Sequence, residues 1–339
     1  MIKRIARGYI IPSAAFTIPN RQYYHADIQK TPEVGDVVYG RVLSIGQHTT
    51  LENCYGRIHK LHDHTRAFFV YGNRYAPDHY ESRVPTDFST KVDLAARSGL
   101  IGEVIEKNEK VADPTQIKII GFVCDKSGNI LNTRKFQKVK LPRARKIKTN
   151  NIILSIGTSM NSGKTTTAAF CCWALTKAGH EVTATKVTGT ASMKDILSFQ
   201  DAGAKKILDF SYFGYPSTYL MEEKELLDLL SMCSTLNRAK YWVVELADGI
   251  LQRETRMLLA HLIAENRIYK LLFNAYDAFS AISGIRILKE EFGVEPDAVS
   301  GVISGSPLLI QEFRQYSEIP VINNQNPRDF NKLLEVILC

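Results

Sequence analysis

The stretch "NIILSIGTSMNSGKTTT", residues 151–167, joins an apolar run to a glycine-containing loop and a Gly-Lys-Thr triplet. The apolar run predicts a buried strand. Ala168, Cys172 and Leu175 follow at i, i+4 and i+7, which predicts a helix that begins near Gly163. A strand, such a loop and a helix in this order are typical of a phosphate-binding loop, because backbone N–H groups and the positive helix end surround the phosphate oxygens.

The spacing of the glycines indicates which kind of loop this is. The usual pattern has a glycine five residues before the glycine of Gly-Lys-Thr. Here Thr158 holds that position and Gly157 precedes it. Gly-Thr, four residues and Gly-Lys-Thr resemble the loop of the dethiobiotin synthetase group. That group lies within a class of P-loop proteins that includes cobyrinic acid amide-forming synthetases and nitrogenase-iron-protein-like ATPases. The resemblance implies an intact loop of a variant length.

Residues of the loop are candidates for nucleotide and metal binding. Gly163 permits close approach of the backbone to phosphate, Lys164 supplies a cation to the β and γ phosphates, and the Thr165 hydroxyl can ligate Mg²⁺. Thr166 is expected to support the α phosphate. The predicted nucleotide-binding set is Gly157, Thr158, Asn161, Ser162, Gly163, Lys164, Thr165 and Thr166.

Two further segments resemble the same family. "TKVTGTAS", residues 185–192, resembles its Lys-Pro-Val segment, which implies that Lys186 lies near phosphate and the substrate carboxylate; an ordinary strand-end lysine is the alternative. "VVELADG", residues 243–249, resembles its Glu-Gly-Ala-Gly-Gly segment, which implies that Glu245 helps to bind Mg²⁺, with Asp248 as the alternative carboxylate. Lys186 lacks the following proline and the second segment lacks two glycines, so substrate identity does not transfer.

Three other polar residues have two interpretations each. Asp195 opens a predicted helix, either as a further acid on the Mg²⁺ side or as a first-turn acid stabilised by the helix dipole. Asn274 and Asp277 have the Asn-x-x-Asp spacing with which GTPases read guanine, but the intervening lysine is absent. A strand-end asparagine followed by a helix-capping aspartate explains the pair equally well. ATP is therefore the expected nucleotide.

The pattern of apolar and polar residues changes at residue 151. Beyond it, apolar runs alternate with amphipathic helices, which predicts an α/β parallel-sheet P-loop NTPase domain over 151–339. Strands are expected near 151–156, 181–187, 205–210, 241–246, 269–273, 298–303 and 319–322. Residues 1–137 show short alternating runs, with a hairpin turn at 125–129, and predict a smaller mainly-β, barrel-like domain. Within it "VGDVVYGRVLSIG", residues 34–46, resembles the opening strands of an S1-like or other OB-type barrel.

Positive charge is concentrated in the first half of the chain. Residues 1–150 hold 25 Lys/Arg against 14 Asp/Glu, whereas residues 151–339 hold 18 against 21, which sums to the net charge of +8. A basic linker is predicted over 138–150, as a solvated connector or as a contact for an anionic partner. The basic half is a candidate for binding nucleic acid or another polyanion.

Three further stretches have a candidate role beside a structural alternative. "HKLHDH" places His59, His62 and His64 around Asp63, as a metal chelate or a polar turn. "YGNRYAPDHYE", residues 71–81, forms a base-stacking loop or an ordinary ordered one. "DFSYFGYPSTY", residues 209–219, follows a strand at the edge where substrates of open α/β sheets bind, so it forms a second-substrate site or a packing loop. The named candidates in the last two stretches are Tyr71, Arg74, Tyr75, Tyr80, Tyr215 and Ser217.

Apolar runs and cysteines indicate where the protein is located. No apolar run approaches the roughly 20 residues of a membrane helix, and the N-terminus has no uninterrupted apolar core, so a cytoplasmic protein is expected. The six cysteines form no Cys-x-x-Cys pair and are expected to be reduced. The family resemblance also implies a possible homodimer.

The combined pattern predicts an ATP- and Mg²⁺-dependent P-loop NTPase that hydrolyses ATP or transfers its γ-phosphoryl group to a carboxylate or hydroxyl acceptor. The predicted catalytic residues are Lys164, Lys186 and Glu245, and the predicted metal ligands are Thr165, Glu245 and Asp195. The alternatives are a nucleotide-switched binding module and a nucleic-acid-directed kinase or ATPase that uses the basic half.

Overall fold

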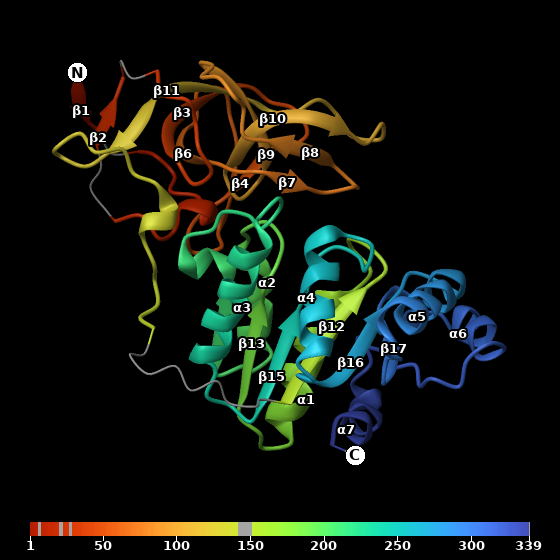
Figure 1. The fold of residues 1–339 in the computed structure, drawn as a ribbon. Helices are drawn as coiled ribbons and strands as arrows, with labels where there is room; N and C mark the ends of the chain where they lie inside the picture. Colours follow the sequence, from red (N-terminus) through yellow and green to blue (C-terminus); the bar gives the residue numbers. More distant parts are fainter. Residues whose placement is uncertain (6–7, 20–22, 27–28, 142–150, 339) are drawn as a thin grey trace. The chain divides into compact units, whose positions relative to one another are not determined.

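The computed structural model describes residues 1–5, 8–19, 23–26, 29–141 and 151–338 (Figure 1). It separates into two units, each with its own core, and we name them the barrel unit and the sheet unit. The barrel unit comprises Met1–Lys140, Gly189–Lys194 and Phe210–Leu220, and the sheet unit comprises Leu141–Thr188, Asp195–Asp209 and Met221–Cys339.

The sheet unit is built on a parallel sheet, as the sequence predicts, and this sheet has six strands. Its order is β14-β13-β15-β12-β16-β17, and every pair of neighbours is parallel. The strands are β12 (Asn151–Gly157), β13 (Val182–Lys186), β14 (Lys206–Asp209), β15 (Tyr241–Glu245), β16 (Ile268–Asn274) and β17 (Ala298–Ser300). All five residues of β15 are buried, which explains why it reads as an unbroken apolar run ending in one charged residue.

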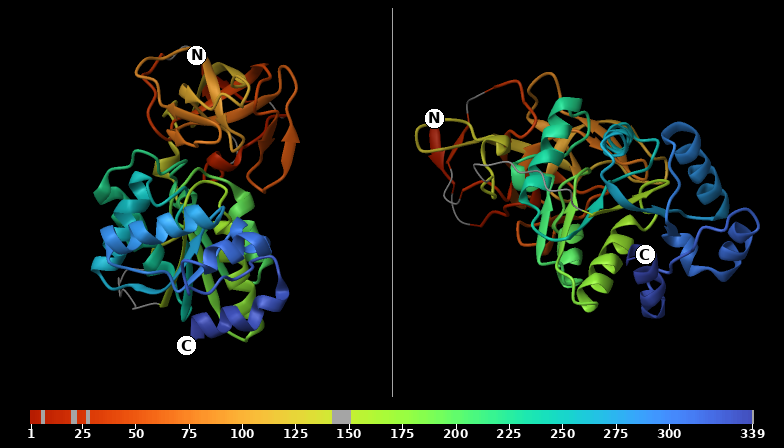
Figure 2. Two further views of the ribbon diagram at one scale, coloured as in Figure 1. Left: turned by 90° about the vertical axis from the view of Figure 1, so that its right-hand side faces the viewer. Right: turned by 60° about the horizontal axis from the view of Figure 1, so that its bottom comes forward.

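Helices cover both faces of this sheet (Figure 2). Helices α1 (Lys164–Lys177) and α7 (Phe330–Leu338) share one core cluster with β12, β13 and β15. Helices α3 (Glu223–Leu236) and α4 (Arg253–Ala264) pack against each other. The remaining helices are α2 (Met193–Asp201), α5 (Ala278–Phe292) and α6 (Pro307–Arg314).

The prediction of a seventh strand, near residues 319–322, is wrong. Of residues 319–322, Val321 forms an isolated parallel bridge with Val299 rather than a strand. Pro320 precedes it and has no N–H to donate, although its carbonyl accepts from the Val299 N–H at 2.9 Å. The proline therefore limits pairing at this edge of the sheet.

The barrel unit is mainly antiparallel, in agreement with the predicted mainly-β domain. Strand pairing forms a closed ring in the order β3-β6-β10-β9-β11 and back to β3. The strands of the unit are β1 (Ile2–Arg4), β2 (Tyr23–His25), β3 (Val37–Ser44), β4 (Thr50–Glu52), β5 (Ile58–Lys60), β6 (Arg66–Tyr71), β7 (Arg74–Tyr75), β8 (Tyr80–Arg83), β9 (Lys91–Ala96), β10 (Leu100–Lys107) and β11 (Gln116–Cys124).

Alternation along these strands builds the core of the barrel. Val38, Val42 and Phe69 belong to the interior cluster, whereas Tyr39, Arg41 and Phe68 alternate with them and point to the other face. The predicted hairpin turn is confirmed, because the Asp125 N–H donates to the Asn129 carbonyl at 3.0 Å.

Two segments from the second half of the sequence belong to the barrel unit, which departs from the predicted division at 137 and 151. The segments pair with each other through a bridge between Thr190 and Ser217. Tyr215 lies beneath the Arg134 guanidinium, 5.2 Å from its ring centroid, and a Cβ on Gly214 would lie 2.2 Å from the Thr133 carbonyl oxygen. Residues 210–220 therefore pack within the barrel unit, which favours the packing alternative for this loop. Of the predicted linker 138–150, residues 142–150 lie outside the described residues.

In the described parts of the chain, no helix is both long enough and apolar enough to cross a membrane. The five cysteines in these parts are free, as expected, and Cys339 lies outside them.

Candidate functional site

The loop after β12 has the glycines where its backbone requires them. A Cβ on Gly157 would lie 2.3 Å from the Ser162 hydroxyl and 2.6 Å from the Asn274 carbonyl oxygen. Gly163 has a φ of 102° and Asn161 a φ of 63°, both in the left-handed region that glycine and asparagine tolerate best. The glycine that the sequence places one residue early is thus fixed by close packing at the end of the strand.

The first turn of α1 has no side-chain cap. Gly163 is the N-cap, and the first backbone bond of the helix runs from the Thr167 N–H to the Gly163 carbonyl at 2.9 Å. The amides of the first turn, including those of Thr165 and Thr166, have no partner inside the helix and point along its axis. The Thr158 amide instead donates to the Asn274 carbonyl at 2.9 Å, so its predicted phosphate contact is not made by this N–H group.

Lys164 folds back over its own loop. Its Nζ donates to the Ser159 carbonyl at 2.6 Å and to the Ser162 hydroxyl at 3.4 Å. The side chain is buried, and this burial lowers the pKa of Lys164 to about 8, although the carboxylate of Glu245 acts in the opposite direction. The ammonium is therefore positioned by the loop at a cost in hydration, which a bound phosphate anion would offset.

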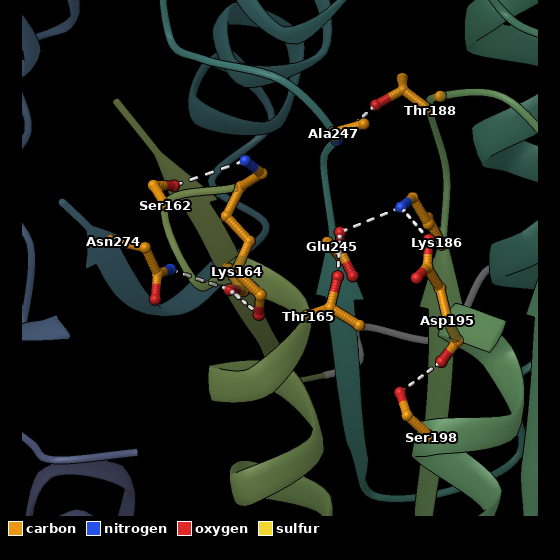
Figure 3. A network of polar contacts seen from close by, with 12 residues as sticks. Ser162, Lys164, Thr165, Lys186, Thr188, Asp195, Ser198, Glu245, Ala247 and Asn274 are labelled. Atoms are coloured by element: carbon orange, nitrogen blue, oxygen red, sulfur yellow. Dashed lines mark hydrogen bonds and ion pairs between the residues drawn. The ribbon is translucent and has the colours of Figure 1, made fainter. Parts of the chain in front are cut away.

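A second cation and two acids lie beside the loop (Figure 3). Glu245 Oε1 accepts a hydrogen bond from the Thr165 hydroxyl at 2.9 Å and lies 3.3 Å from the Lys186 Nζ. The same Nζ lies 2.5 Å from Asp195 Oδ2. Burial alone would lower the pKa of Lys186, but the carboxylates of Asp195 and Glu245 raise it above its ordinary value. The structure thus brings together all three predicted catalytic side chains and all three predicted metal ligands.

One oxygen of this cluster lacks a partner in the part of the chain that the structure describes. Glu245 is 1% exposed, yet its Oε2 accepts no hydrogen bond. A buried carboxylate oxygen without a partner is costly, and Mg²⁺ prefers such hard oxygen ligands together with a hydroxyl. Glu245 and Thr165 therefore fit a Mg²⁺ ion. Asp195 faces Lys186, so it fits as an acid that neutralises this cation.

The alternative carboxylate, Asp248, lies on a loop that contacts the loop after β12. A Cβ on Gly249 would lie 2.2 Å from the Thr158 carbonyl oxygen, and the Ile250 N–H donates to the Gly157 carbonyl at 2.9 Å. Asp248 adopts a left-handed φ of 59° and raises the pKa of Lys164 through its charge, after the larger contribution of Glu245. Glu245 remains the carboxylate that contacts Thr165.

The Asn-x-x-Asp pair is structural. Asn274 is fully buried, and its amide donates to the Ile156 carbonyl at 2.7 Å and the Ser155 hydroxyl at 3.0 Å. Asp277 caps α5 by accepting from the Ser280 N–H at 2.7 Å. Both side chains are therefore engaged as the second interpretation of the sequence expects.

Sequence reasoning missed two side chains that brace the site. Asn324 donates to the Thr167 hydroxyl at 2.8 Å, so a residue distant in sequence holds the first turn of α1. Thr188 accepts from the Ala247 N–H at 2.7 Å and joins the ends of β13 and β15. The amide-rich run "NNQN" before Pro327 could have indicated that Asn324 has a polar role. A single threonine after a strand, such as Thr188, gives no such signal.

The remaining candidates are engaged elsewhere. No group of three potential metal-ligating His, Cys, Asp or Glu side chains exists among the described residues, and His59 and His64 instead bond to Asn53 and Arg41 at 3.1 and 3.0 Å. In the stretch 71–81, three of the four named residues point into the barrel unit. They are Tyr71, Arg74 and Tyr80, with exposures of 0%, 8% and 1%, so they present no open stacking surface.

Comparisons with known proteins show likeness in fold only. No protein-family model and no curated protein sequence matches the chain. A ParA family ATPase from Chlorobium tepidum TLS aligns with a TM-score of 0.35 and 14% identity over 56% of this chain and 88% of that one. The signal recognition particle receptor FtsY from Elizabethkingia anophelis, in complex with GDP, aligns at 0.34 and 14% over 55% of this chain and 59% of that one. HypB from Helicobacter pylori, in complex with nickel, aligns at 0.34 and 13% over 56% of this chain and 86% of that one. The resemblances to dethiobiotin synthetases and S1 or OB-type barrels stay predictions from the sequence.

Proposed function

We propose that the chain is a Mg²⁺-dependent P-loop ATPase that hydrolyses ATP or transfers its γ-phosphoryl group. The observation that carries the proposal is the buried Glu245 carboxylate, bonded to Thr165 at the start of α1 and ion-paired with Lys186. A carboxylate, a hydroxyl and two lysines beside a helix N-terminus without a side-chain cap are a suitable set for a triphosphate with its metal. The proposal includes the cytoplasmic location expected from the sequence.

The roles of the side chains follow from their positions. The first-turn amides of α1 and the Lys164 ammonium would hold the β and γ phosphates. Glu245 and Thr165 would hold Mg²⁺, which when bound neutralises charge on the phosphate oxygens. Lys186, kept protonated by Asp195 and Glu245, would stabilise negative charge on the transferred group without a rearrangement of solvent.

The acceptor is an oxygen nucleophile. In the transfer, the acceptor oxygen forms a bond to the γ phosphorus while the bond from that phosphorus to the bridging oxygen of ADP breaks. Water as acceptor gives hydrolysis, and a carboxylate or carbamate gives an activated acyl phosphate, as the resemblance to dethiobiotin synthetase implies. The position of Lys186 suits an anionic acceptor.

ATP is proposed over GTP because the residues that could read guanine are otherwise engaged. The Asn274 amide donates to the strand and loop of its own unit, and Asp277 caps α5. A base would not reach the Asn274 side chain, which is fully buried.

The direct test is uptake of a fluorescent ATP analogue with and without Mg²⁺. Lys164→Ala is expected to weaken uptake by at least about a hundredfold, the effect of removing a buried charged contact. Lys205→Ala is the matched control, because this lysine is 70% exposed and pairs with Glu181. Unchanged uptake by the Lys164 variant would sink the proposal.

A nucleotide-switched binding module is the second candidate, favoured by the route of the chain. Residues 189–194 belong to the barrel unit, yet Lys186 precedes them and Asp195 follows them. Movement of this pair toward a phosphate would therefore pull on both ends of a barrel-unit segment. Slow turnover that no carboxylate, RNA or DNA stimulates, together with partner binding that changes between ATP and ADP, favours the switch. Strong stimulation favours the enzyme.

A further inference from the structure

Four cations lie in one row across the barrel unit. Lys118 on β11 stands directly opposite Lys91 on β9 and, on its other side, opposite Arg41 on β3. Arg41 in turn stands opposite Arg66 on β6. Residues directly opposite each other on neighbouring strands project from the same face of a sheet. We call these four residues the cation row; with strands about 4.8 Å apart, it spans roughly 14 Å.

The cation row points away from the barrel core. Lys118 lies between Ile117 and Ile119, which both belong to the interior cluster. Lys91, Lys118 and Arg66 are exposed, and Arg41 is half-buried. The row is therefore on the outer surface of four consecutive strands of the closed ring.

The cation row has no counter-charge in the described residues, where none of its four members forms an ion pair. Other exposed cations of the chain do, such as Lys107 with Asp113 and Arg83 with Glu81. Asp93 lies two residues from Lys91 on β9 and so projects from the same face, but it accepts from Gln116 and from the Val104 N–H. Like charges placed directly opposite each other destabilise a sheet, so the row is costly until an anion lies across it.

A layer of aromatic side chains adjoins the cation row. Tyr39 and Phe68 are the next outward positions on β3 and β6, and they stand opposite each other. Tyr9 stacks on Phe68 with ring centroids 4.7 Å apart, and Tyr24 lies 5.3 Å from Tyr39. Tyr9 and Tyr24 are half-buried, whereas Tyr39 and Phe68 are buried, so Tyr9 and Tyr24 are the members of this layer that a base could contact.

We propose that this face binds single-stranded nucleic acid, with the cation row against the phosphates and the half-buried tyrosines against the bases. Cations that track a backbone beside aromatic rings are the combination by which single strands are bound without sequence readout. The inference goes beyond the proposed ATPase, because no residue of the row or of the aromatic layer belongs to the nucleotide site.

The test is fluorescence anisotropy of the full chain with labelled oligothymidylate and oligouridylate of equal length, over a series of salt concentrations. If all four cations meet a phosphate, log K is expected to fall with log [salt] at a slope of about −2.8, from −0.7 per contact. The double variant Arg41→Gln/Lys118→Gln is expected to reduce that slope by about 1.4 and to weaken low-salt binding by about tenfold or more.

Two controls separate this face from general positive charge. Lys126→Gln/Lys135→Gln removes the same charge from exposed positions of the barrel unit outside the row and should leave the slope unchanged. Tyr24→Ala should weaken binding by about tenfold, and Tyr24→Phe should restore it, because stacking needs the ring and not the hydroxyl. Circular dichroism and ATP-analogue uptake of each variant report intact folding.

Three results would overturn the proposal. The first is an Arg41→Gln/Lys118→Gln variant that binds with the affinity and the salt slope of the wild-type chain. This result would place the phosphate contact elsewhere, for example in the basic stretch 138–148. The second is tighter binding of duplex than of single strand, because paired bases cannot stack on tyrosines. The third is equal competition by polyglutamate of matched charge, which would assign the face to polyanions in general. A difference between the two oligonucleotides would tell which of DNA and RNA is preferred.

Discussion

The two groups of cations in this protein are built by different means. Lys164 is buried at the start of α1, where the Ser159 carbonyl accepts from its Nζ, and Lys186 is half-buried beside Asp195 and Glu245. Lys118 and its three neighbours lie on the outside of the barrel unit, held in line by strand register. Buried charges act over short distances and depend on exact partners, whereas exposed charges act together over longer distances and are screened by salt.

The largest expected effect concerns Glu245, the buried carboxylate that contacts Thr165 and Lys186. Glu245→Gln keeps the shape of the side chain but removes its charge, so Mg²⁺ would lose its ligand while Lys186 keeps Asp195. Turnover is expected to fall by about two to three orders of magnitude, as when one preorganised electrostatic contact is removed. Steady-state phosphate release over a Mg²⁺ titration measures this, with the exposed Glu181→Gln as control. A variant with the wild-type Mg²⁺ dependence would show that another acid holds the metal, and Asp248 is the first candidate.

The second-largest effect is expected from salt, which should weaken oligonucleotide binding much more than ATP-analogue binding. Between about 50 and 200 mM salt, a slope near −2.8 weakens oligonucleotide binding by about fiftyfold. ATP-analogue binding at the buried site should change only a few-fold, because buried charges are screened less. Parallel titrations of both ligands on one sample measure the difference. Equal salt dependence of the two ligands would contradict the contrast.

The pH response of nucleotide binding should be smaller. Burial lowers the pKa of Lys164 to about 8. In the free protein the side chain therefore loses its proton as pH rises above 8, and a triphosphate must restore it on binding. Affinity for ATP is expected to fall about tenfold from about pH 7 to pH 9, with uptake of a proton. Calorimetry in buffers of different ionisation enthalpy measures that proton, and Lys164→Arg, which stays charged, should show no such uptake.

The smallest effect is expected where a charged residue near the site only supports a helix. Asp277→Ala removes the cap of α5 and should destabilise the chain by about 1 kcal/mol. The preference for ATP over GTP should not change, because the side chain does not read the base in this proposal. Urea unfolding and competition between the two nucleotides measure both effects. A changed preference would restore the guanine-reading interpretation of Asn274 and Asp277.

The sequence was informative for local features and for the site they form. The sequence predicted three features: the strand, loop and helix around Lys164, the order of strands and helices, and the barrel-like character of residues 1–137. Each of them depends on hydrophobic periodicity and on glycine positions that are close together in the chain. Lys186 and Glu245 were predicted from the family resemblance of their segments, and Asp195 was predicted from its place at the start of a helix. That Asp195 faces Lys186 rather than an open site was not predicted.

What the sequence determined by itself is the presence of two kinds of structure and of a glycine-containing loop between a strand and a helix, because hydrophobic period and glycine positions are encoded locally. What only the tertiary structure decided is which distant residues meet. Asn324 braces Thr167, residues 189–194 and 210–220 join the barrel unit, and four cations from separate strands form one row. Such contacts depend on strand register and on the path of the chain, and a shift of one residue would turn every cation of a strand to the opposite face.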